Sequence, residues 1–182
     1  MLGLPQIVGT ATAWYLLFHL NEFLFGSFDW AKVFISWVFL PAAARLLSVM
    51  LFGWRGALGL WLGTLLTNEG SYGGGLSPMS LTVATLSATG PLIAVQLTMH
   101  GHRVPMNLRG LTAGQLTVFA VVGALCNVVP HNVFFWLAGM TSSPVGGVVP
   151  MFVGDLLGTV LVLYALRFAL VTLERFVRFP TP

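Results

Sequence analysis

The sequence predicts an all-α membrane protein: a polytopic bundle of about six transmembrane helices with both termini in the cytoplasm. Three observations support this fold class, namely the scarcity of charge, the length of the apolar runs and the placement of arginine between them. Of 182 residues, 57% are hydrophobic and 7% are charged, and the mean hydropathy is +0.89. Soluble domains carry roughly a quarter charged residues. The composition therefore excludes a water-soluble domain, a disordered chain and a nucleic-acid-binding protein.

The apolar runs define the expected helices, because about 20 apolar residues cross a bilayer. The six segments cover about 4–25, 31–52, 56–67, 78–99, 109–129 and 148–172, so residues 1–182 form a single transmembrane domain. No Lys or Arg precedes the first segment, so we expect it to be retained rather than cleaved as a signal peptide. The third is short and is either a weakly tilted span or a re-entrant helix packed inside the bundle. The apolar stretch 131–140 is too short to cross, and we expect an interfacial or re-entrant turn there.

Arginine marks one side of the membrane. The basic residues of alternate connections are Arg55, then Arg103 and Arg109, then Arg175 and Arg178 after the last segment. The other connections carry Asp29 with Lys32, then Glu69, then no charge. Because cytoplasmic loops are enriched in Lys and Arg, both termini are predicted to be cytoplasmic. We expect a multi-pass protein of the bacterial inner membrane.

Small residues recur at helix-packing spacing. The pairs are Gly59 with Gly63, Gly110 with Gly114 and Gly154 with Gly158. Such pairs let helix backbones approach closely where lipid provides no hydrophobic drive for association. Packing within one bundle is the favoured interpretation, and a homo-oligomer interface remains the alternative.

Two charges lie inside predicted spans, where ionisable groups are costly. Arg45 is about two turns from the cytoplasmic end of the second span, and Asp155 about a turn and a half from the outer end of the sixth. An extended Arg side chain can cover that vertical gap, so the two are candidates for a buried ion pair. The pair either fixes helix register or belongs to a site, and snorkelling of Arg45 to the interface is a third possibility.

The remaining polar residues gather at the predicted outer side. The candidate ligand-binding residues are His19, Glu22, Asn68, Glu69, Asn127, His131, Asn132 and Asp155. His19 and Glu22 are spaced i,i+3, and Asn127 and His131 i,i+4, so each pair shares one helix face. These residues predict a polar pocket open to the outer side, although polar helix ends also occur at interfaces without any ligand. His19, Glu22, His131 and Asp155 are suitable metal ligands but form no spacing motif, so neither a metal site nor a cofactor is predicted.

Catalysis has no sequence signature here. The chain contains no phosphate-binding loop, nucleophile elbow, paired-cysteine zinc motif or HExxH pattern. The single Cys126 cannot form an intrachain disulfide. The sequence therefore predicts a protein that binds a ligand or a partner rather than an enzyme.

Three segments carry a family resemblance. They are Phe39-Leu40-Pro41-Ala42-Ala43-Ala44, then Phe52-Gly53-Trp54-Arg55-Gly56-Ala57 with the Gly59–Asn68 helix, and last Phe152-Val153-Gly154-Asp155-Leu156-Leu157-Gly158. In this order, over about residues 35–165, the chain resembles the MASE-type membrane-associated sensor domains of bacteria. Those domains precede diguanylate cyclase or histidine kinase modules. The resemblance implies a sensory membrane domain.

By position, the resemblance emphasises Pro41, Arg55, Gly63, Asn68, Gly154, Asp155 and Gly158. The chain departs from the family pattern at Ala43 and Ala44, where the family tends to have Gly, and at the charged Arg45. No Pro follows the last motif, and no output module follows within the 182 residues. A sensor of this kind would signal through another chain.

Two other functions fit the size and topology. The substrate-binding S subunits of energy-coupling-factor transporters have a similar length, six spans and an outward pocket, although the chain contains no S-subunit motif. A structural accessory subunit of a larger membrane complex would instead use its aromatic and Gly-rich surfaces to bind protein or lipid. In each case the expected partners are the lipid bilayer and another membrane protein or a signalling or transport subunit.

Overall fold

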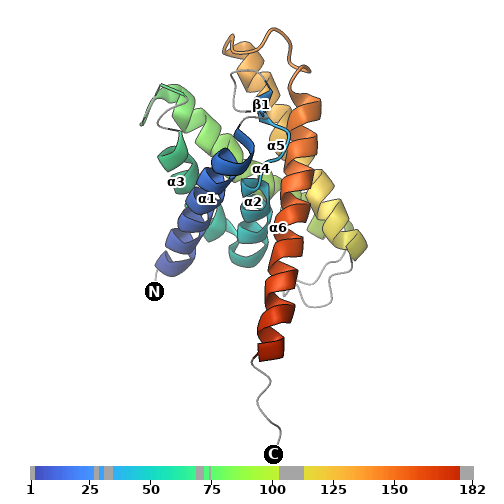
Figure 1. Ribbon diagram of the computed structural model, residues 1–182. Coiled ribbons are helices and arrows are strands. Elements are labelled where there is room, and N and C mark those ends of the chain that lie inside the picture. The colour runs from blue at the N-terminus through green and yellow to red at the C-terminus, as the bar shows by residue number, and fades with distance from the viewer. Residues whose placement is uncertain are drawn as a thin grey trace, which may run out of the picture.

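The described part of the protein is a bundle of six helices (Figure 1). A computed structural model describes residues 3–26, 29–30, 35–68, 72–73, 75–102 and 113–176. The helices are α1 (Leu4–Phe25), α2 (Pro41–Phe52), α3 (Trp54–Thr67), α4 (Pro78–His102), α5 (Ala113–Leu137) and α6 (Val148–Phe176). Two short antiparallel strands, β1 (Asp29–Trp30) and β2 (Ile35–Ser36), lie between α1 and α2. The all-α class predicted from the sequence is confirmed.

Three helices of the described part are long and apolar enough to cross a membrane. Their apolar portions are Pro78–Met99 in α4, Thr117–Leu137 in α5 and Val148–Leu166 in α6. By contrast, α2 has 12 residues and α3 has 14. At a rise of 1.5 Å per residue these helices are about 18 and 21 Å long, shorter than the roughly 30 Å hydrocarbon core. Membrane association is thus supported, while the six-span topology stays a prediction.

The second predicted span, 31–52, is helical only from Pro41, and residues 31–34 lie outside the described part. Residues 35–40 instead form strand β2 and a turn. An apolar run alone does not distinguish a strand from a helix. Pro41 has no N–H to continue a helix backwards, although it suits the first helical turn. The described residues of this span are therefore a two-residue strand and a turn followed by a helix of 12 residues.

The apolar stretch after residue 130 was predicted to be separate from the fifth span, and this prediction was wrong. Helix α5 continues through Pro130 to Leu137. Membrane helices tolerate an internal proline when the freed carbonyl is accommodated by a neighbour. The carbonyl of Cys126, which Pro130 cannot bond, lies beside Gly90 of α4, where a Cβ would be only 2.9 Å from that oxygen. The glycine thus gives this carbonyl room in the α4–α5 interface.

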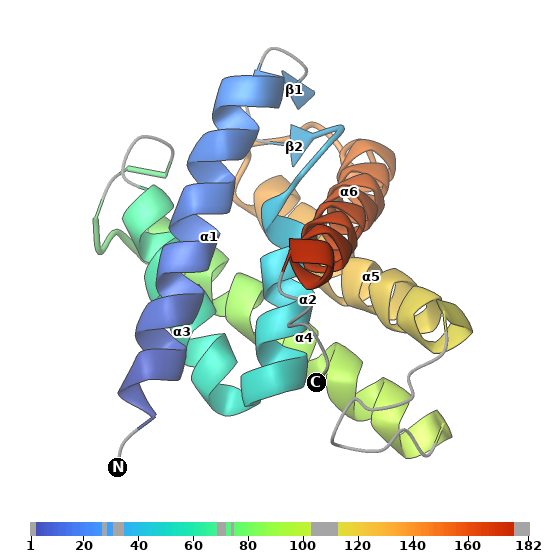
Figure 2. The ribbon, with the colours of Figure 1, turned by 60° about the horizontal axis from the view of Figure 1, so that its bottom comes forward.

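The short helix α2 lies at the centre of the bundle (Figure 2). It contacts all five other helices, and nine of its residues are buried. Its apolar side chains join a core that includes Trp14 of α1, Leu60 of α3 and Phe119 of α5. Because α2 begins only at Pro41, the space above its first turn is enclosed by the other helices and by β2.

Two of the three glycine pairs lie where neighbouring segments of the backbone approach each other closely. A Cβ at Gly59 or Gly63 would collide with α1, and the nearest atoms to Gly63 belong to Trp14. A Cβ at Gly158 would collide with the backbone carbonyl of Phe39. These pairs pack within the bundle. Of the third pair, Gly110 lies outside the described residues and Gly114 is exposed.

In Figure 1, α1 begins and α6 ends at the lower end of the bundle, whereas β1 and the connection between α5 and α6 lie at the upper end. The last part of α6 extends below the other helices. Tyr164 and Phe168, in the second half of this helix, are exposed. The number of membrane passes stays a prediction. The side of the membrane that each end faces is part of the proposal below.

A candidate ligand-binding cavity

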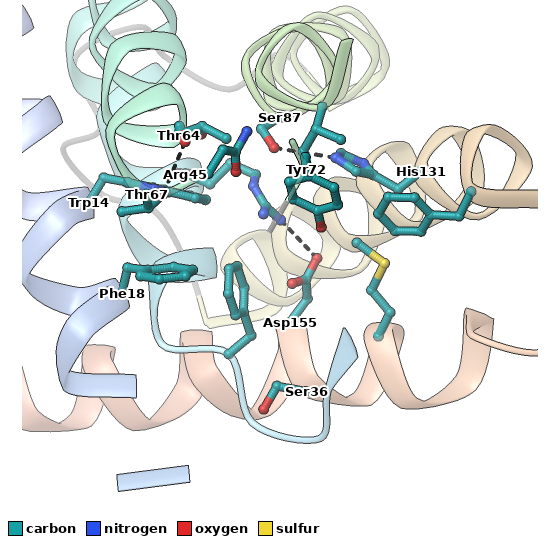
Figure 3. A pocket seen from close by; sticks show the side chains of 15 residues that line it. Trp14, Phe18, Ser36, Arg45, Thr64, Thr67, Tyr72, Ser87, His131 and Asp155 are labelled. Carbon is teal, nitrogen blue, oxygen red and sulfur yellow. Dashed lines mark hydrogen bonds and ion pairs between the residues drawn. The ribbon is translucent and has the colours of Figure 1, made fainter. Parts of the chain in front are cut away.

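A cavity lies inside the upper half of the bundle, above the first turn of α2 (Figure 3). The space open to the centres of water molecules is about 60 Å³. One buried water occupies about 15 Å³, and the 60 Å³ counts only where water centres can lie, so the cavity has room for several waters or a small solute. All six helices contribute to its wall. The lining residues are Trp14, Phe18, Ser36, Phe39, Arg45, Thr64, Thr67, Asn68, Tyr72, Val83, Ser87, His131, Phe135, Met151 and Asp155.

A buried ion pair crosses the base of this cavity. Arg45 Nη1 donates to Asp155 Oδ2 over 3.0 Å, and the two residues are 5% and 3% exposed. Arg45 lies one turn into α2, and helical side chains incline toward the helix N-terminus, which is where the cavity is. Asp155 faces it from the second turn of α6. The contact that the sequence suggested between these residues is present.

Asp155 is part of a longer chain of polar contacts. Asn127 Nδ2 donates to the same Oδ2 atom at 2.8 Å. One turn later, His131 Nδ1 lies 2.8 Å from the carbonyl of Asn127, and its Nε2 lies 3.3 Å from Ser87 Oγ. A carbonyl only accepts, so Nδ1 carries the proton; in the neutral ring Nε2 then accepts from the Ser87 hydroxyl. These contacts tie α2, α6, α5 and α4 together around the cavity.

Several buried polar atoms in the cavity wall have no protein partner. Among the described residues these atoms are Arg45 Nε, Thr64 Oγ1 and Asp155 Oδ1. Polar groups inside proteins are nearly always hydrogen-bonded, and leaving one unpaired costs about 1–3 kcal/mol. One positive donor, one negative acceptor and one hydroxyl in residues that line the cavity thus lack a partner within the protein.

Aromatic side chains form much of the remaining wall. The guanidinium carbon of Arg45 lies 5.4 Å from the ring centroids of both Trp14 and Phe39. Trp14 Nε1 donates to Thr67 Oγ1 at 3.1 Å, which fixes α1 against α3. On the other side Tyr72 stacks on Phe135, with centroids 6.1 Å apart. Burial raises the pKa of Tyr72, so its hydroxyl stays neutral.

The sequence-predicted site residues divide into three groups. Asn68, His131 and Asp155 line the cavity. Asn127 and Asn132 are buried beside it without lining it; Asn132 Nδ2 donates to the Val128 carbonyl at 2.9 Å. The other candidates are outside it: His19 and Glu22 are exposed on α1, and Glu69 is outside the described residues.

The pairing of His19 with Glu22 was therefore misleading, because spacing shows that two residues share a face but not which way that face points. Its aromatic contacts place His19 against Tyr15, with ring centroids 4.2 Å apart. No cluster of three or more His, Cys, Asp or Glu occurs within the residues that the structure describes.

Sequence reasoning missed most of the small hydroxyl residues of the wall. Thr64, Thr67 and Ser87 lie within apolar helical segments and carry no charge. Their signal was present, since Thr64 and Thr67 are spaced i,i+3 and Thr67 follows Gly63 at i,i+4, on the helix face that packs inward.

Comparisons with protein-family models, with curated proteins and with solved structures gave no match.

Proposed function

We propose that this protein is a MASE-like sensory subunit of the bacterial inner membrane, which binds a small molecule in the central cavity and signals through another membrane protein. The observation that carries the proposal is the set of unpaired buried polar atoms, Arg45 Nε, Thr64 Oγ1 and Asp155 Oδ1, around a cavity lined by all six helices. A ligand that satisfies these atoms would stabilise one arrangement of the bundle over others.

The arrangement of α6 supports signalling. Asp155 near its start contacts the cavity, while its far end projects beyond the bundle. Tyr164 and Phe168 in its second half are exposed. A change at Asp155 on ligand binding would therefore move a helix whose other end is free to contact a partner. In the proposed topology the cavity faces the outer side and the projecting end the cytoplasm.

A substrate-binding transport subunit is the second candidate, and one observation favours it. A smaller cavity of about 20 Å³ is also lined by both residues of the ion pair, together with Leu46, Pro91 and Gly123 among others. Together with the half-helix α2, which begins inside the bundle, this resembles the interrupted helices that line transporter sites. Copurification with an ATPase-bearing module would favour this candidate over sensing.

The proposal is tested by thermal unfolding of the purified chain in lipid nanodiscs against a broad panel of small solutes. We expect at least one class of solute to raise the unfolding midpoint of the wild type. Thr64→Leu should abolish this shift because the larger side chain occupies the cavity. Thr89→Leu is the matched control, since Thr89 is exposed on α4 and lies outside the cavity wall.

Loss of the solute response in both variants, or a response that Thr64→Leu leaves intact, would contradict binding in the cavity. If no solute raises the unfolding midpoint of the wild type, the proposed sensory function is wrong.

A further inference from the structure

The cavity wall is electrically balanced. Its charged side chains, among the described residues, are Arg45 and Asp155, which are in contact and carry opposite charges. A ligand with a net charge would leave one charge uncompensated inside the bundle, which is strongly unfavourable. The cavity therefore selects molecules with zero net charge.

The ion pair nevertheless leaves one charged atom free on each side. Asp155 Oδ2 accepts from both Arg45 and Asn127, whereas Oδ1 has no partner. Arg45 uses Nη1 for that contact, whereas its buried Nε has no partner. A complementary ligand presents an anionic acceptor to Arg45 and a cationic donor to Asp155, because charge-assisted hydrogen bonds are about twice as strong as neutral ones.

Resting on the sensory function above, we propose that the ligand is a small zwitterion, an α-amino acid with a short side chain. Its carboxylate would bind Arg45 Nε and its ammonium group Asp155 Oδ1. The Thr64 hydroxyl can donate to the first group or accept from the second. The aromatic rings of Phe39 and Phe135 offer apolar surface to the side chain. With room for several waters, the cavity suits a small amino acid such as alanine.

The test is isothermal titration of the intact chain in nanodiscs with four molecules of similar size. L-Alanine carries both charges, propionate and ethylammonium one each, and propanamide none. We expect L-alanine to bind at least tenfold more tightly than each of the other three. Equal or tighter binding of propanamide would overturn the zwitterion, and so would equal binding of either singly charged molecule.

Two variants assign the contacts. Asp155→Asn should weaken L-alanine binding at least a hundredfold and reduce the ratio of L-alanine to propionate affinity to about one. Because that variant removes a buried charge and can fail to fold, Thr64→Val provides a second test. The Thr64 hydroxyl makes no hydrogen bond in the structure, so this isosteric change should leave the unfolding midpoint in place or raise it, and should weaken L-alanine binding about tenfold.

Thr89→Val, on the exposed face of α4, should leave the affinity unchanged. Unaltered L-alanine affinity in Thr64→Val and in folded Asp155→Asn would overturn the assignment.

The solute panel separates this inference from the sensory function. Suppose that L-alanine does not bind, but another solute raises the unfolding midpoint of the wild type and not of Thr64→Leu. The proposed zwitterionic ligand is then wrong, and the proposed sensory function is retained. If nothing in either set binds, both are wrong.

Discussion

Truncation of Asp155 to alanine should destabilise the bundle by about 3–5 kcal/mol, because it leaves the Arg45 charge buried without its partner. Both side chains are almost fully buried, at 3% and 5% exposure, so only the few waters that fit in the adjacent cavity can replace the lost carboxylate. The variant also leaves Asn127 Nδ2, now 2.8 Å from Asp155, without its acceptor. The loss of that single hydrogen bond contributes about 1–3 kcal/mol of the total.

The double variant Arg45→Met with Asp155→Leu separates the contribution of the ion pair to stability from the cost of leaving one charge unpaired. Replacing a buried pair by apolar residues of similar volume is often neutral or stabilising. We therefore expect the free energy of unfolding of the double variant to exceed that of Asp155→Ala by about 2 kcal/mol or more. It should remain below the wild-type value, because the amide of Asn127 is still without its acceptor. Arg55→Met is the control for loss of an arginine, since the half-buried Arg55 has no acidic partner among the described residues.

The assay is reversible unfolding in mixed micelles with increasing SDS, followed by tryptophan fluorescence. The free energy of unfolding is compared among the wild type, the two variants of the pair and the Arg55→Met control. If Asp155→Ala lies within 1 kcal/mol of the wild type, the ion pair is not the buried contact described above.

Further predictions concern packing and topology. Gly158→Ala should cost about 1–3 kcal/mol in the same unfolding assay, because its Cβ meets the backbone just before α2. Gly123→Ala is the control and should be neutral or stabilising, since the atom nearest to its Cβ is 3.6 Å away. Equal effects of the two substitutions would refute the close approach at Gly158. Trp14→Phe should cost about 1 kcal/mol through loss of the indole hydrogen bond to α3, and an unchanged unfolding energy would argue against that bond. In a cysteine-free background, Ser142→Cys should react with an impermeant maleimide from outside intact cells and Trp54→Cys only after permeabilisation; the reverse pattern would invert the proposed topology.

The sequence predicted the helices well where apolar runs and their breaks coincide with the true ends. The expected first segment, 4–25, corresponds to α1, and the short third segment, 56–67, to most of α3. It failed at two prolines for opposite reasons. Pro41 begins a helix in the middle of an apolar run, which hydropathy alone predicts as one continuous span. Pro130 lies inside a helix, although a proline predicts the end of one.

The site was predictable in part because depth restricts a buried charge. Buried charges such as Arg45 and Asp155 need partners. Counting helical turns from the end of each predicted span placed the two residues at depths in the membrane that allow contact. Direction around the helix axis was not available in the same way. An apolar helix gives no polar face to orient it, so His19 was assigned inward and Thr64 was overlooked.

The central claim, that the cavity above α2 is a ligand site, is tested most directly by one dissociation constant measured in three proteins. The ligand is the solute that most raises the wild-type unfolding midpoint, and its affinity is measured by calorimetry for the wild type, Thr64→Leu and Thr89→Leu. Binding in the cavity predicts an affinity at least a hundredfold weaker in Thr64→Leu and unchanged in Thr89→Leu. The same dissociation constant in all three proteins would place the ligand elsewhere and contradict the claim.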